Sequence, residues 1–129
     1  MTKTQQTLLT EALEAQQQSY SPYSNFKVGA ALLADDHSIY KGCNVENASY
    51  PLGQCAEASA ISAMVSCGAR EIKEVLIASP NDEFCPPCGG CRQKIREFSG
   101  PDTVVHMATK SGDIKSVPLR ELLPLAFEL

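Results

Sequence analysis

Three cysteines lie close together in the stretch EFCPPCGGCRQ at residues 83–93. They are Cys85, Cys88 and Cys91, and a fourth cysteine, Cys55, opens the segment CAEA further upstream. Thiols at this spacing can form a disulfide, a redox dithiol, a structural metal knot or a catalytic metal centre. The Cys-x-x-Cys pair alone does not separate these alternatives.

Length and composition narrow the choice. With 129 residues, the chain is expected to form a single domain over residues 1–129. No apolar run approaches the ~20 residues of a membrane span, and the N-terminal segment lacks the pattern of a signal peptide. We therefore expect a cytoplasmic protein with no membrane partner, whose six cysteines stay reduced and serve metal binding or catalysis. The net charge of −4, without a basic stripe, argues against a nucleic-acid partner.

The spacing of the thiols favours a catalytic metal centre. Cys88 and Cys91 are three residues apart, so both sulfurs would point to one side of a helix at its first turn. A catalytic zinc ion takes three protein ligands and keeps a fourth position for water. Cys55 is the expected third ligand. Glu57 would then lie beside the ion, where a carboxylate can carry protons. A four-thiolate knot that also uses Cys85 stays open, but it gives Glu57 no role.

A zinc centre with three thiolate ligands carries excess negative charge. Three thiolates outweigh the charge of one Zn²⁺ ion, so the centre needs neighbouring groups that withdraw negative charge. The partial positive charge of the helix N-termini offsets part of this negative charge. Arg92 is the first candidate for a further hydrogen-bond donor. Two prolines stiffen the chain directly after Cys85, which we expect to be a packed or exposed free thiol. Cys43 and Cys67 are expected in the core.

The hydrophobic pattern predicts the elements that position these residues. Apolar residues at helical spacing predict helices over residues 4–19, 55–68 and 88–98. Strands are expected over residues 27–34, 38–45, 74–79, 103–109 and 114–119, and a short helix or turn over 120–129. This order predicts an α/β sandwich with about five strands in one sheet. Each cysteine-bearing helix begins after a loop, which is where α/β folds form their sites.

Several stretches resemble a known family. CAE at 55–57, followed by PCGGCRQ at 87–93, resembles the zinc-dependent cytidine/deoxycytidine deaminases, whose signature is His or Cys, one residue, Glu, and later Pro-Cys-x-x-Cys. YSPYSNFKVGAAL, GCNVENASYP and RELLPLAF resemble further blocks of the family in the family order. The short length is similar to the homotetrameric class. The resemblance implies a three-layer α/β/α sandwich around a mixed five-stranded sheet, with one Zn²⁺ ion per subunit.

The resemblance also implies an activity. Cys55, Cys88 and Cys91 match the zinc ligands, Glu57 matches the proton shuttle, and the backbone amide of Ala56 matches the group that binds the carbonyl of the base. The implied reaction is hydrolytic deamination of cytidine and 2′-deoxycytidine to uridine and 2′-deoxyuridine, with release of ammonia, in pyrimidine salvage. A deaminase of another aminopyrimidine nucleoside, such as blasticidin S, and a non-catalytic zinc module are the alternatives.

Five further residues match substrate-binding positions of the family. Asn44 and Glu46 match the pair that holds the ribose 3′-hydroxyl, and Phe26 matches the aromatic residue that packs on the pyrimidine. Tyr50 matches a sugar-side residue of the tetrameric class. Phe127 matches a C-terminal aromatic residue that reaches the site of a neighbouring subunit.

The chain departs from the family after the signature Glu. The tetrameric family usually has Arg there, which donates to the zinc thiolates, and this chain has Ala58. Either another donor replaces it, with Arg92 as the first candidate, or the site is tuned differently. Cys85 is a second and milder departure, because the family more often has a small residue near that position.

Overall fold

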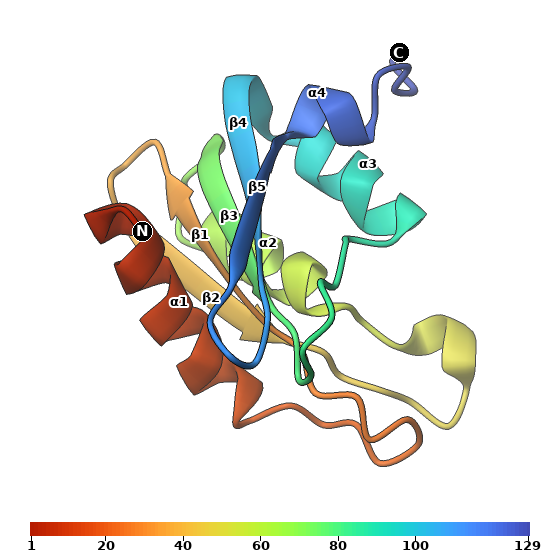
Figure 1. Ribbon diagram of the computed structural model, residues 1–129. Coiled ribbons are helices and arrows are strands. Elements are labelled where there is room, and N and C mark those ends of the chain that lie inside the picture. Colours follow the sequence, from red (N-terminus) through yellow and green to blue (C-terminus); the bar gives the residue numbers. More distant parts are fainter.

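The structure is a computed structural model that describes all 129 residues. Its centre is a five-stranded sheet of order β2-β1-β3-β4-β5, in which β3 and β4 are parallel and the other neighbours are antiparallel (Figure 1). The elements, in chain order, are α1 (Lys3–Gln16), β1 (Gly29–Ala34), β2 (Ile39–Cys43), the 3-10 turn η1 (Tyr50–Leu52), α2 (Ala56–Ser66), β3 (Ile72–Ala78), α3 (Gly89–Glu97), β4 (Ser99–Ala108), β5 (Ile114–Pro118) and α4 (Leu119–Leu122). The predicted order of helices and strands is confirmed.

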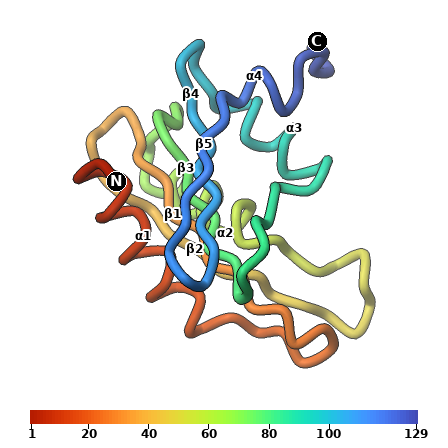
Figure 2. The backbone as a smooth tube through the Cα atoms, viewed as in Figure 1, coloured from red at the N-terminus to blue at the C-terminus, as the bar shows by residue number.

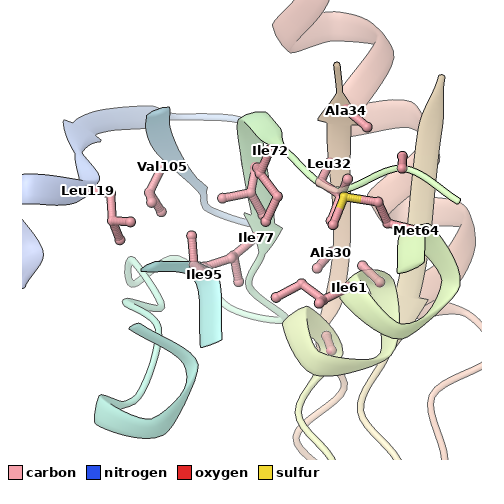
Figure 3. Close-up of a cluster of buried hydrophobic side chains, with 14 of the residues drawn as sticks. Ala30, Leu32, Ala34, Ile61, Met64, Ile72, Ile77, Ile95, Val105 and Leu119 are labelled. Carbon is pink, nitrogen blue, oxygen red and sulfur yellow. The ribbon is translucent and has the colours of Figure 1, made fainter. Parts of the chain in front are cut away.

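Helices cover both faces of the sheet, and a hydrophobic cluster fills each of the two interfaces. On one face α1 packs Leu8 and Ala12 against the strands, including Leu76 of β3. On the other face Met64 of α2 and Ile95 of α3 pack against the opposite side of the same strands (Figure 3). The central strand β3 is therefore buried on both sides over residues 75–78, which explains the apolar run there. These layers confirm the three-layer α/β/α sandwich.

The ends of α1 show how local chemistry sets an element's length. The side chain of Thr2 accepts a hydrogen bond from the backbone of Gln5, and the side chain of Gln5 accepts one from the backbone of Thr2. This capping box starts the helix at residue 3. The helix ends at Gln16 rather than at residue 19, because the next backbone bonds, from Gln18 to Ala15 and from Ser19 to Gln16, are those of a tighter turn. The buried Gln16 amide donates to the carbonyls of Lys27 and Ala78.

Gly42 sets how closely α2 lies on β2. A Cβ atom at this position would be 2.5 Å from the backbone nitrogen of Ala60 and 2.6 Å from Cβ of Ser59. Only glycine permits such an approach. The contact fixes α2 against the sheet, and with it the N-terminal turn that carries the chemistry.

Other boundaries also differ from the sequence prediction, most of all those of β4 and α4. β4 begins at Ser99 rather than at residue 103, and its register with β3 shifts between Ile72 and Glu74, which breaks the alternating pattern at that end. The C-terminal helix α4 is only four residues long. No helix of the chain is both long and apolar enough to cross a membrane.

Candidate active site

The N-termini of α2 and α3 bring three sulfur atoms together on one face of the sheet. Cys55 is the N-cap residue of α2, Cys88 is the N-cap residue of α3, and Cys91 lies in the first turn of α3. Their Sγ atoms all lie within 4.8 Å of one another, and those of Cys55 and Cys88 are 3.9 Å apart. Sequence analysis predicted that these three residues meet, and the structure brings them together.

The spacing of the sulfurs fits a zinc ion. Thiolates at zinc-ligand distance in a tetrahedral site are roughly 3.8 Å apart, close to the 3.9 Å between Cys55 and Cys88. Cys91 is buried, Cys55 is partly exposed and Cys88 is exposed. One side of the three-sulfur group therefore faces solvent, which suits a centre with a position for water.

Hydrogen bonding among the thiols already favours one thiolate. The bond from the Cys91 thiol lowers the pKa of Cys55 to about 6, against the opposing effect of burial, and Cys88 contributes a further bond. The same interaction, together with burial, raises the pKa of Cys91. Zinc binds thiols in their deprotonated form, so a thiol whose pKa lies below neutrality is ready to bind the ion.

Glu57 is a buried carboxyl beside these sulfurs. It lies in the first turn of α2 and is only 5% exposed. Burial raises its pKa to about 7, partly opposed by its own backbone N–H and increased by the negative charge of Cys55. A carboxyl with a pKa near neutrality can both accept and return a proton at physiological pH. The sequence prediction that Glu57 lies next to the thiols is consistent with this placement.

The raised pKa of Glu57 predicts that this carboxyl, although suited to proton transfer, lowers the free energy of unfolding as pH rises. In the unfolded chain the carboxyl has its ordinary pKa of 4.5, so the folded protein holds a proton that unfolding releases. Stability is therefore lost as pH rises from about 4.5 through about 7. We expect Glu57→Gln to stabilise the zinc-free protein at pH ~8 by up to about 3 kcal/mol. Urea unfolding measures this, with Glu121→Gln as an exposed control. An equal gain at pH ~5 would contradict the explanation.

Arg92 does not take the place of the missing family arginine. Its Nε donates to the carbonyl of Pro87 at 2.9 Å, and its Nη1 donates to the carbonyl of Leu122 at 3.0 Å. The side chain thus ties the loop before α3 to the end of α4, and the prediction that it donates to the thiolates is wrong. Only the position of α4, which the local sequence does not give, could have shown this.

The remaining cysteines lie outside the three-sulfur group. Cys85 is half-buried against the core cluster, and burial raises its pKa, as expected for a packed thiol. Cys43 is partly buried. The prediction of a core position for Cys67 is wrong: Cys67 is the exposed C-cap residue of α2, where the helix ends before Gly68.

A cavity of about 340 Å³ lies between two of the loops. Glu46 projects into it, and its carboxylate accepts hydrogen bonds from the backbone N–H groups of Tyr23 and Ser24 at 2.9 and 3.1 Å and from the Ser24 hydroxyl. The Ser24 hydroxyl bond holds the pKa of Glu46 below its usual range. The rings of Tyr23 and Tyr50 meet edge to face across 6.0 Å. The lining residues are Tyr23, Ser24, Glu46, Asn47, Tyr50 and Gly53.

Backbone pairing connects this cavity to the thiols. Val45 and Gln54 exchange two hydrogen bonds of 2.8 Å, so the residue before Glu46 is paired with the residue before Cys55. Glu46 also donates its backbone N–H to the carbonyl of Tyr20 at 2.8 Å. The loops over residues 17–28 and 44–55 therefore run together beyond the end of the sheet (Figure 2). Sequence analysis did not predict Tyr23, Ser24, Asn47 or Gly53 as site residues, because loop pairing leaves no periodic signal.

The other predicted substrate residues occupy different surroundings. The Asn44 amide donates to the carbonyl of Phe26 at 2.7 Å, and its oxygen accepts from the backbone of Val28 at 3.0 Å. It holds the loop in place and keeps one N–H for a ligand. Phe26 is exposed on this loop. Phe127 does not line the cavity: it is exposed, and its backbone is held by the side chain of Gln93 on α3.

The fold and the three-thiol group fit the class of catalytic zinc sites, which keep three protein ligands, rather than closed four-ligand zinc knots. Residues 2–107 match the family described as the cytidine and deoxycytidylate deaminase zinc-binding region. The chain is 43% identical to a cytidine deaminase of Halalkalibacterium halodurans over 95% of its own length and 92% of the relative. It is 43% identical to one from Sporosarcina psychrophila over 93% and 88%.

Solved structures agree with the sequence comparison. The crystal structure of cytidine deaminase from Burkholderia pseudomallei superposes with a TM-score of 0.90 at 39% identity, covering 98% of this chain and 100% of that chain. The enzyme from Mycobacterium tuberculosis gives a TM-score of 0.85 at 36% identity, covering 97% and 98%. The chain belongs to the cytidine and deoxycytidylate deaminase family, whose zinc-binding region it contains.

Proposed function

We propose that this chain is a zinc-dependent deaminase of cytidine and 2′-deoxycytidine, with Cys55, Cys88 and Cys91 as the zinc ligands and Glu57 as the proton carrier. The observation that supports it most strongly is the meeting of three thiols with a buried carboxyl at two helix N-termini. Relatives named cytidine deaminase that match most of the chain support the choice of substrate.

The reaction replaces the exocyclic amine at C4 of the pyrimidine by an oxygen atom from water and releases ammonia. The zinc ion, when bound, supplies Lewis-acid activation of that water. Glu57 takes one proton from the attacking water and places it on N3 of the ring. It then takes the second proton from the new hydroxyl at C4 and passes it to the departing amine, which leaves as ammonia. The burial of Glu57 excludes bulk water from this transfer. It also raises the pKa of the carboxyl to about 7, so that the group can both accept and donate a proton near neutral pH.

The remaining contacts orient the nucleoside. We assign the cavity beside the thiols to the sugar, with Glu46 and the free N–H of Asn44 on the 3′-hydroxyl and Tyr50 on the sugar side. The backbone N–H of Ala56, at the N-terminus of α2, is assigned to the carbonyl of the base. Phe26, exposed on the adjoining loop, is assigned to the face of the pyrimidine.

Glu46→Gln tests the assignment of the sugar. The substitution removes the charged acceptor, and we expect kcat/KM for cytidine to fall by roughly 10- to 100-fold, mostly through KM. With 3′-deoxycytidine, which lacks the hydroxyl, the variant and the wild type should differ little. Glu121→Gln, an exposed carboxylate on α4 outside the cavity, is the control. An equal loss on both substrates would assign Glu46 to loop structure alone, because it also binds Tyr23 and Ser24.

The choice of substrate is tested by an absorbance assay. Zinc-loaded protein is given cytidine, 2′-deoxycytidine and blasticidin S, and the rates are compared at equal concentrations. We expect both cytidines to be deaminated and blasticidin S to react far more slowly. A faster rate on blasticidin S would assign the enzyme to that alternative, and no reaction on any of the three would favour a non-catalytic zinc module.

We also propose a homotetramer in which sites are shared between subunits. Exposed large apolar residues gather on the loops around the site, a distribution that favours a protein interface; they include Tyr20, Tyr23, Phe26, Val45, Tyr50 and Leu52. Phe127, exposed at the C-terminus, is assigned to the site of a neighbouring subunit. Native mass spectrometry should give four subunits, and Phe127→Ala should raise KM without loss of zinc. A fully active monomer would contradict the proposal.

Two further assignments concern the domain organisation and the cellular compartment. We propose that residues 1–129 act as one catalytic domain, because both hydrophobic clusters share the same sheet. We place the protein in the cytoplasm, because all six cysteines are free and three of them must stay reduced to bind zinc.

A further inference from the structure

A second cavity, of about 350 Å³, lies between α2 and α3. Its lining includes Gln54, which precedes Cys55, and Ala58, which follows Glu57. The short side chain of Ala58 thus leaves space at the position where the family usually has arginine. Lys94 lines the same cavity from α3.

The three-thiol centre needs a nearby cation. Three thiolates carry more negative charge than one Zn²⁺ ion neutralises, and excess negative charge weakens the ion as a Lewis acid. Helix N-termini offset part of the excess. Arg92 donates its Nε and Nη1 to the carbonyls of Pro87 and Leu122 rather than to the thiols.

Lys94 is placed to provide that charge. It follows Cys91 by three residues on α3, so both side chains lie on the same side of the helix. Lys94 takes part in none of the ion pairs of the structure, although Glu97 also lines the cavity. We propose that Lys94 is a positioning residue that balances the negative charge of the three-thiol centre across the cavity beside Ala58. This inference rests on the proposed function.

The Lys94 side chain lines this cavity and is exposed to solvent. Because Lys94 is exposed, solvent screens the interaction and the expected effect is moderate.

Zinc affinity tests the inference without using activity. Competition with a chromophoric chelator at low salt should show that Lys94→Met binds zinc roughly fivefold more weakly than the wild type. Lys94→Arg should bind like the wild type, and so should Lys115→Met, an exposed control on β5. Adding Ala58→Arg to Lys94→Met should restore the affinity, because the new side chain occupies the cavity. The loss should also shrink at high salt.

Several results would overturn the inference. Equal affinities for Lys94→Met and Lys115→Met would show that Lys94 does not act on the centre. A loss in Lys94→Arg as large as that in Lys94→Met would assign the effect to packing rather than charge. The two proposals fail separately: if the wild type deaminates cytidine while Lys94→Met keeps full zinc affinity, only the role of Lys94 is wrong. If the affinities behave as expected but no nucleoside is deaminated, only the proposed activity is wrong.

Discussion

Glu57→Gln is expected to lower kcat for cytidine by about 10³- to 10⁴-fold, while the protein still binds zinc. Glutamine has nearly the shape of glutamate but cannot take a proton from water, so the proposed proton transfer loses its carrier. Because Glu57 lies beside the sulfurs and is not one of the three proposed ligands, the zinc content should stay at one ion per chain.

The loss must be separated from damage to the fold. Glu121→Gln, on the exposed side of α4, should keep wild-type turnover. In the zinc-free form Glu57→Gln should be more stable than the wild type above neutral pH, since it no longer buries an ionisable carboxyl. A variant that is inactive and yet more stable points to chemistry rather than folding. Near-normal turnover in Glu57→Gln would contradict the mechanism.

The second large effect is expected for Cys88→Ser. A hydroxyl is a far poorer zinc ligand than a thiolate, and we expect zinc affinity to fall by roughly 10²- to 10³-fold. Turnover should fall with it and recover only in part at high zinc concentration. Chelator competition and metal analysis measure the loss. Cys67→Ser, at the exposed C-terminal end of α2, is the matched control and should change neither quantity. Full zinc binding by Cys88→Ser would exclude Cys88 as a ligand.

Much of the fold could be predicted because the hydrophobic pattern and residue spacing within single segments indicated the helices and strands. The apolar run of β3 indicated a strand buried on both faces, and the structure places it between two hydrophobic clusters. The spacing of Cys88 and Cys91, with Cys55 at another helix start, was enough to predict one thiol group, since helix N-termini on the same sheet face have few ways to be arranged.

What the sequence did not reveal depends on contacts between distant segments. Arg92 binds the end of α4, whose position depends on the tertiary fold. The cavity around Glu46 is formed by backbone pairing of two loops, which no side-chain pattern records. Cys67 was assigned to the core from residue type alone, although its place at the end of α2 exposes it.

Zinc K-edge X-ray absorption of the loaded protein tests the central claim most directly. We expect three sulfur neighbours at about 2.3 Å and one lighter oxygen or nitrogen neighbour at about 2.0 Å, the last of which should change when a hydrated-pyrimidine inhibitor binds. Four sulfur neighbours and no response to the inhibitor would contradict a catalytic centre at Cys55, Cys88 and Cys91, and would instead favour a structural zinc knot.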